Sequence, residues 1–294
     1  MGWLRSAAGA AVFLLASLCG AAASAAPALW VARDADTEIY LFGTLHLLTP
    51  DAAWRTPAYD AAYERAQTVW FEADLARADS ATMGDLMGRY GVDPARPLSV
   101  RLPPQELAAL QPALARGGLD LAGVDHLRPW AAALTLSIRP KVTQGYRADA
   151  GADLVVARQA RAGEKEIRTL ETLEDQIRIF ADLPEPVELQ YLADVVRELT
   201  APPRRGGVSL QQAWLAGDVR ALDRGILSVL RRDTPEFHEA FIRRRNLAWA
   251  ETLDGVLLAP GGVHLVNVGA LHMAGEDGLP ALLRARGYRV ERVQ

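Results

Sequence analysis

Two segments near opposite ends of the chain share one pattern: a continuous apolar run, then glycine, two further residues and histidine. They contain Gly43-Thr44-Leu45-His46 and Gly269-Ala270-Leu271-His272, each after β-type apolar residues. Such runs predict strands that are buried on both faces, as in a parallel sheet. Glycine lets the chain leave a strand sharply, which would place each histidine above the carboxyl edge, where open α/β sheets bind ligands. We therefore expect the two strands to be neighbours or near-neighbours, with His46 and His272 facing one cleft.

The remaining patterning predicts sheet-forming ends and a helical middle. The predicted strands cover residues 29–32, 39–42, 68–71, 165–170, 263–268 and 288–293. A helix predicted over residues 57–66 joins the second and third strands into a βαβ-like unit. Residues 80–254 have mostly helical periodicity. We expect an α/β fold, with α+β as the alternative, whose central sheet is formed by the N- and C-terminal segments around a large helical insert at about 80–254.

Local signals also predict where individual helices begin. Thr234-Pro235-Glu236 is typical of a helix start, with the Thr234 hydroxyl as the cap, and this helix would run to Gly255. Asp277 is expected to cap a last helix over residues 279–286. Residues 201–207, which contain Arg204 and Arg205, combine prolines and glycines and predict an exposed loop.

The first 26 residues have the pattern of an export signal. A short positive start precedes an apolar run over residues 7–20, which is too short for a comfortable membrane span. Ser24-Ala25-Ala26 offers small residues for cleavage before Pro27. We therefore expect a signal peptide over residues 1–26, a single mature domain over 27–294 without a stable membrane span, and a periplasmic or secreted location. The only cysteine, Cys19, would be removed, so the mature domain depends on core burial and not on disulfides.

The amino-acid composition limits which kinds of partner this chain can bind. Half of the residues are hydrophobic, 23% are charged, and 32 basic against 36 acidic residues give a formal charge of −4. This is the mix of a globular protein, and it excludes a disordered chain, a collagen-like chain and a multi-span membrane protein. A nucleic-acid partner would require a concentrated basic face, so none is expected.

A third predicted strand ends in a carboxylate. Glu72 follows Trp70-Phe71 directly, and Asp74 lies two residues further on. Two imidazoles and a carboxylate from separate strand ends can make a three-ligand metal site with an open position for water. The same groups can equally form a metal-free site in which one histidine is the base. Glu72 has a third possible role, as a helix cap or the partner of an arginine.

The other polar candidates have simpler interpretations. Asp74 is expected to support the site or cap a helix, and His126 to belong to local structure before a helix. His238 lies in a charged segment and is expected on a solvated helix face, whereas His264 is expected to be buried or capping. The run Arg243-Arg244-Arg245-Asn246 is typical of a solvated basic face.

Several segments resemble those of one known family. They are residues 40–46, 71–75, 170–176, 245–246 and 268–279, followed by Gly287-Tyr288, and they span the chain in the family's order. The chain resembles the TraB/GumN family, which is related to the Tiki proteins and more distantly to erythromycin-esterase-like and ChaN-like proteins.

The resemblance to the Tiki proteins implies a metal-dependent protease. His46, His272 and Glu72 would bind a divalent ion such as Mn, Co or Zn, with Arg245 and Asn246 as further catalytic residues. The ion would activate a bound water, and Arg245 would stabilise the developing oxyanion. The leading hypothesis is thus an exported metal-dependent hydrolase, specifically a peptidase, with a peptide or small-molecule ester as substrate.

Two alternatives follow from the more distant relatives. The erythromycin-esterase-like proteins imply a metal-free hydrolase in which His46 is the base and Glu72 orients it. The ChaN-like proteins imply a non-catalytic protein that binds a haem-like ligand.

Overall fold

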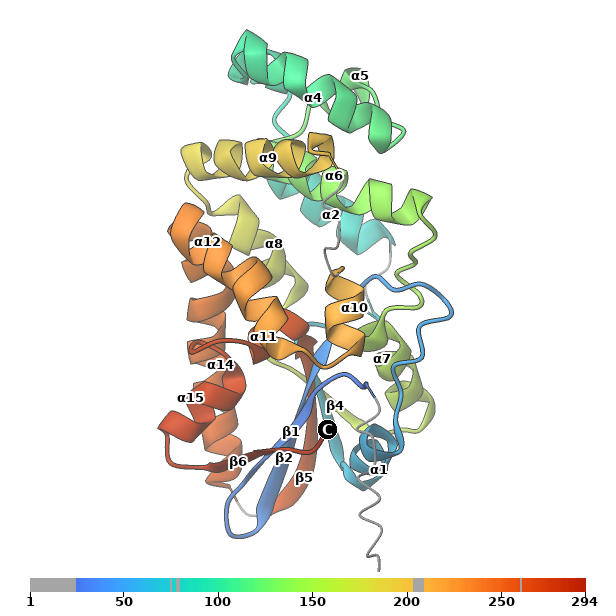
Figure 1. Ribbon diagram of the computed structural model, residues 1–294, viewed down its shortest axis with the longest axis vertical. Helices are drawn as coiled ribbons and strands as arrows, with labels where there is room; N and C mark the ends of the chain where they lie inside the picture. The colour runs from blue at the N-terminus through green and yellow to red at the C-terminus, as the bar shows by residue number, and fades with distance from the viewer. Residues whose placement is uncertain (1–24, 75, 78–79, 203–208, 260) are drawn as a thin grey trace, which may run out of the picture.

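A six-stranded mixed sheet lies at the centre of the described part of the chain (Figure 1). The computed structural model describes residues 25–74, 76–77, 80–202, 209–259 and 261–294. Most of the predicted signal peptide, and also Leu75, Arg204 and Arg205, lie outside these residues. The strands are β1 Leu29–Arg33, β2 Thr37–Thr44, β3 Thr68–Phe71, β4 Glu166–Thr169, β5 Gly262–Gly269 and β6 Arg289–Arg292. All six predicted strands are confirmed: β3 has the predicted bounds, and the ends of the others differ from the prediction by at most two residues.

The order of the strands brings the two ends of the chain together. The order is β4-β3-β5-β2-β1-β6, in which β4, β3, β5 and β2 are parallel and β1 is antiparallel to both β2 and β6. In the central pair, Gly43 lies opposite Val268 and Thr44 opposite Gly269. The prediction that the two glycine-bearing strands are neighbours is therefore confirmed, and so is the α/β fold class.

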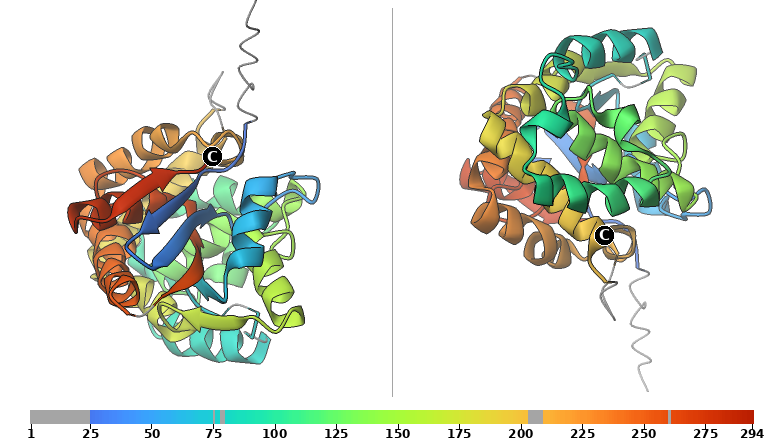
Figure 2. Two further views of the ribbon diagram at one scale, coloured as in Figure 1. Left: turned by 90° about the horizontal axis from the view of Figure 1, so that it is seen from below. Right: turned by 90° about the horizontal axis from the view of Figure 1, so that it is seen from above.

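Helices cover both faces of the sheet, as the view from below shows (Figure 2, left). Tyr40 and Phe42 of β2 belong to the core under α1 Pro57–Arg65 and α7 Ala152–Ala162. Ile39 and Leu41 of the same strand belong to the opposite core, under α14 Arg244–Leu257 and α15 Leu279–Ala285. Alternate side chains of a strand point to opposite faces, so an uninterrupted apolar run is what a strand between two helical layers requires.

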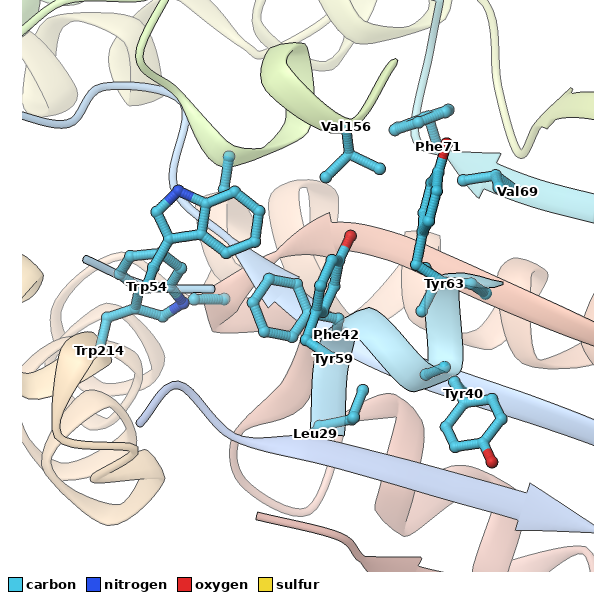
Figure 3. Close-up of a cluster of buried hydrophobic side chains, with 14 of the residues drawn as sticks. Leu29, Tyr40, Phe42, Trp54, Tyr59, Tyr63, Val69, Phe71, Val156 and Trp214 are labelled. Carbon is cyan, nitrogen blue, oxygen red and sulfur yellow. The ribbon is translucent and has the colours of Figure 1, made fainter. Parts of the chain in front are cut away.

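An aromatic cluster anchors the carboxyl end of β2 (Figure 3). The Phe42 ring lies 4.5 Å from the Tyr59 ring and 5.7 Å from the Trp54 ring, centroid to centroid. Trp214, from α10 Leu210–Leu215, packs on the same group and donates from Nε1 to the Gly43 carbonyl over 2.7 Å. Burying each large apolar side chain contributes about 1.5–3 kcal/mol, so the cluster holds the start of the first glycine motif firmly.

The part of the helical insert that does not cover the sheet lies beyond the carboxyl ends of the parallel strands, in the upper half of Figure 1. Its core is formed between α4, α6 and α9 and is continued by a smaller cluster between α2, α6 and α8. The helices of this part are α2 Ser80–Tyr90, α3 Leu98–Arg101, α4 Pro104–Arg116, α5 Leu121–Val124, α6 Pro129–Thr143, α8 Leu173–Ala181 and α9 Glu185–Thr200. Nowhere in the described ranges is a helix both long and apolar enough to cross a membrane.

Two predicted helix caps are wrong. Thr234 precedes α13 Pro235–His238, but its hydroxyl donates to the Leu230 carbonyl of the preceding helix, α12 Ser228–Asp233, and does not cap α13. The N-cap of α15 is Gly278, whereas the Asp277 carbonyl accepts from the Asn246 amide over 2.7 Å. In both places the side chain has another partner: the Thr234 hydroxyl bonds four residues back, and the Asp277 carboxylate lies 3.5 Å from Nε of Arg243.

The helix that begins at Pro235 continues further than predicted. A π-helical turn over Glu239–Arg243 joins α13 to α14, which ends at Leu257 rather than Gly255. The segment before it comprises α11 Val219–Leu222 and a second π-helical turn over Asp223–Leu227.

Candidate active site

The two glycine motifs meet at the carboxyl edge of the sheet because β2 and β5 are parallel neighbours. Neither glycine has a positive φ, so the backbone freedom of glycine is not what the motifs use. A Cβ on Gly43 would lie 2.9 Å from Cα of Ala270, and a Cβ on Gly269 would lie 3.1 Å from Oε1 of Glu72. The glycines are therefore required by the close approach of the two strand ends and the carboxylate, not by a sharp turn.

Glu72 is held in place at the end of β3 by three donors. Its Oε1 accepts from the Gly269 amide over 2.6 Å, and its Oε2 accepts from Nη2 of Arg245 over 2.7 Å and Nε2 of Gln176 over 2.9 Å. Burial raises the pKa of Glu72, but the charge of Arg245, with smaller contributions from the nearby histidines, lowers it to about 2. Glu72 is thus an ionised carboxylate whose main partner is an arginine.

Arg245 fills the space between Glu72 and His272. Its Nη1 donates to Nε2 of His272 over 3.0 Å, and its Nη2 and Nε donate to the Glu171 carboxylate over 2.6 and 3.1 Å. The guanidinium carbon also lies 4.5 Å from the centre of the Trp249 ring. One buried cation is therefore shared by two carboxyl groups, Glu72 after β3 and Glu171 just after β4, and burial raises the pKa of Glu171.

The solvated basic face predicted for residues 243–246 is only half correct. Arg243 and Arg244 are exposed, whereas Arg245 and Asn246 are buried together with Trp249 and Leu253 on the inner side of α14. The helical period turns positions 245, 246, 249 and 253 towards the sheet, and the carboxylates there make burial of the arginine possible.

His272 is a neutral imidazole with a defined tautomer. Its Nδ1 lies 2.6 Å from Oδ1 of Asn246, an oxygen that only accepts, so Nδ1 carries the proton. Its Nε2 consequently presents a lone pair to the guanidinium of Arg245. Burial, followed by the charge of Arg245, lowers the pKa of His272 to about 3.

His46 has a different environment from His272. About half of its side chain is exposed (53%), and its Nδ1 lies 2.8 Å from Oδ2 of the buried Asp153. Desolvation lowers the pKa of His46, but the carboxylate of Asp153, with Glu72 beyond it, outweighs this and raises the pKa to about 9.

Asp153, the partner of His46, is a side chain that the sequence analysis did not single out. It lies in the first turn of α7, where the helix N-terminus favours a carboxylate. A Cβ on Gly151 would lie 2.3 Å from the His46 carbonyl oxygen, so glycine is needed there for α7 to approach His46. The only signal in the sequence was that Gly151 lies two residues before Asp153 at the start of a helix. The partner of Asp153, His46, is 107 positions away in the chain.

The predicted site residues lie together. Glu72, Arg245, His272 and Asn246 form one hydrogen-bonded chain, while His46 and Glu72 line the same small cavity. Asp74 pairs instead with Arg161 and, at 3.7 Å, with Arg77, outside this chain.

The three other histidines lie outside this group. The prediction of a solvated His238 is wrong: it is buried, and its Nε2 lies 3.8 Å from Oδ2 of Asp277, because α13 turns inward before the π-helical turn. His264 is half-buried and accepts from Nε1 of Trp70 over 3.3 Å. The His126 carbonyl accepts from the Asp93 amide, a local structural role.

The arrangement does not fit a bound metal ion. Across the described ranges, no three His, Cys, Asp or Glu side chains are grouped so that they could hold one. The physical reason is that the lone pair of His272 Nε2 and one oxygen of Glu72 face the Arg245 guanidinium. An ion at this place would have to displace that cation.

Fold and site together define a class of protein. It has an α/β sheet that brings two Gly-x-x-His motifs and a glutamate to one edge, as in the Tiki-like superfamily. The chain belongs to the TraB/PrgY/gumN family, whose model matches residues 28–292. It is similar to the "Uncharacterized protein YbaP" of Escherichia coli K12, at 25% identity over 273 residues, covering 88% of this chain and 92% of that protein. The YbaP protein of Shigella flexneri matches at the same identity and coverage, and no solved structure matches.

Proposed function

We propose that this protein is a hydrolase of peptides or esters in which His46 is the general base and Asp153 orients it. The observation that carries the proposal is the 2.8 Å contact between Nδ1 of a half-exposed His46 and Oδ2 of a buried Asp153. A carboxylate that accepts from Nδ1 leaves Nε2 as the proton acceptor and stabilises the imidazolium that forms. The earlier alternative made Glu72 the orienting group, but both oxygens of Glu72 have other donors.

The proposed reaction is a water attack on a carbonyl group. Nε2 of His46 takes a proton from water as the water oxygen bonds to the carbonyl carbon, and the C=O electron pair moves to the carbonyl oxygen. That pair then returns, the bond to the leaving amine or alkoxide breaks, and His46 gives its proton to the leaving group. The raised pKa of His46 means that the free base form becomes abundant only at alkaline pH, where it is a stronger base than an ordinary histidine.

Arg245 has a positioning role in this scheme. Its Nε, Nη1 and Nη2 atoms all donate within the protein, to Glu171, His272, the Phe241 carbonyl and Glu72. The oxyanion role suggested by the family resemblance would require one of these bonds to break. We assign Arg245 to holding Glu72 and His272, and Asn246 to holding the tautomer of His272.

Metal analysis and chelation distinguish the proposed metal-free hydrolase from a metal-dependent one. Turnover of an ester and a peptide library should survive EDTA in purified wild type and be lost in His46→Ala. If chelation abolished turnover and Mn, Co or Zn restored it, the protein would instead be a metal-dependent enzyme. The Arg245 side chain would then have to move away from Glu72 and His272 when the ion binds. Absence of all turnover, with a co-purified haem-like ligand, would support the non-catalytic alternative.

We also propose that the protein is exported and cleaved near Pro27. The fold tolerates this cut, because β1 begins at Leu29 and, among the described residues, the first hydrogen bond to a distant segment is the one that the Pro27 carbonyl accepts from Nε2 of Gln294 over 2.6 Å. N-terminal sequencing of periplasmic or secreted protein should begin near Pro27. Exported protein that still begins at Met1 would contradict cleavage.

A further inference from the structure

A small cavity lies between the ends of β2 and β3 and helix α7. Its polar lining consists of Thr44, His46, Glu72, Asp153 and Asn267. Its volume is about 10 Å³, close to the volume that a single buried water molecule requires. The cavity therefore has the size and the polar walls of a water site.

Two of the lining atoms are buried without a hydrogen-bond partner within the described residues. They are Oγ1 of Thr44 and Oδ1 of Asp153, in residues that are 1% and 7% exposed. Buried polar atoms in folded proteins are nearly always hydrogen-bonded to protein or to ordered water. Both of these atoms belong to residues that line the same cavity, which indicates one shared partner.

We propose that the cavity binds one water molecule, which donates to Oδ1 of Asp153 and is held on its other side by the Thr44 hydroxyl. Asp153 is then fixed at both oxygens, with Oδ2 on Nδ1 of His46 and Oδ1 on the water. Thr44 becomes a positioning residue for His46, acting through the water and Asp153. The effect on turnover rests on the proposed function, whereas the water site rests on the cavity and its two unpaired atoms.

The chemistry of the lining favours water over a cation. Calcium takes six to eight oxygen ligands and magnesium demands octahedral geometry, whereas the two unpaired oxygen atoms here are one carboxylate oxygen and one hydroxyl. Water needs only two to four polar partners and can donate and accept at once. The Asn267 carboxamide, fixed by Tyr59 O–H donating to its Oδ1 over 3.0 Å, completes the polar wall.

Thr44→Val tests the water site because valine keeps the shape of threonine and removes the hydroxyl. High-resolution crystal structures should show a water in the cavity of wild type, in contact with Oδ1 of Asp153, and none in Thr44→Val. Thr44→Ser, which keeps the hydroxyl, should show the water again. An empty cavity in wild type, or an undisturbed water in Thr44→Val, would overturn the proposal.

The positioning role has its own readouts. In the NMR spectrum of wild type, the Nδ1 proton of His46 should be observed as a slowly exchanging signal. Thr44→Val should lose this signal, with kcat falling about tenfold to a hundredfold and KM little changed, and Thr44→Ser should recover most of both. A Thr44→Val protein that keeps the signal and the rate would contradict positioning. If wild type turns over no substrate, the proposed function fails, while the density and the proton signal still decide the water site.

Discussion

Nη1 of Arg245 donates to Nε2 of His272 over 3.0 Å, at the place where the sequence pattern predicts a metal ion. The same guanidinium lies 2.7 Å from Glu72, so the protein supplies its own cation between two of the three predicted ligands. This contact also explains the protonation of the site, because a cation on Nε2 favours a neutral imidazole and an ionised carboxylate.

Replacing Arg245 should destabilise the fold strongly. Arg245→Met leaves Glu72 and Glu171 buried without their cation, which is expected to lower the free energy of unfolding by about 3–5 kcal/mol. Arg243→Met is the control two residues earlier: its ion pair with Glu239 is exposed and its contact with Asp277 is longer, at 3.5 Å, so it should cost less than about 1 kcal/mol. Urea denaturation measures both, and equal losses would contradict the role of the buried pair.

Breaking the His46–Asp153 contact should affect catalysis more than folding. Asp153→Asn keeps the shape of the side chain but removes the charge that stabilises the imidazolium, so kcat should fall by about 10²- to 10⁴-fold. The wild-type kcat/KM should rise with pH towards about 9, because the base must be deprotonated. The pH–rate profile of Asp153→Asn should shift towards the ordinary range of histidine. An unchanged profile would exclude Asp153 as the orienting group.

His272 should make the fold sensitive to mild acid. Its pKa is lowered to about 3 in the folded protein, so between about pH 6.5 and 3 the unfolded chain binds a proton that the folded protein does not. The stabilising contribution is complete above about pH 6.5 and is lost as pH falls, with a slope of up to about 1.4 kcal/mol per pH unit.

The comparison with His272→Gln isolates this effect. His238 and His264 also have lowered pKa values, but they are present in both proteins. Urea titrations at several pH values should therefore give a shallower acid dependence for His272→Gln. If the free energy of unfolding depended on pH in the same way in both proteins, His272 would not have a lowered pKa in the folded state.

The first motif glycine should tolerate no side chain. In Gly43→Ala the new Cβ would lie 2.9 Å from Cα of Ala270, a backbone atom that cannot move cheaply, so a loss of about 1–3 kcal/mol is expected. Gly255→Ala is the control, since nothing lies within 4 Å of its Cβ position in α14, and it should gain about 0.5–1 kcal/mol. Melting temperatures that move in the same direction would contradict the packing argument.

Much of the frame could be predicted because it depends on short-range patterns. The apolar runs of β2 and β5 identify strands buried on both faces, and parallel pairing then brings their carboxyl ends to one edge. Glu72 was found for the same reason, since it follows directly after a buried strand. The caps predicted at Thr234 and Asp277 are wrong because each side chain has another partner, the Leu230 carbonyl and the Arg243 guanidinium respectively.

The sequence by itself determined the strands, the helical insert and the edge where the histidines and Glu72 gather, because side-chain periodicity records burial locally. Only the tertiary structure decided how these groups are paired. Asp153 reaches His46 across 107 positions, and Arg245 turns inward to pair with Glu72 and Glu171 where a local pattern predicted a solvated face. These pairings depend on the distances between segments that are remote in the chain and on the electrostatic cost of leaving a buried charge without a partner. A local sequence pattern contains information on neither.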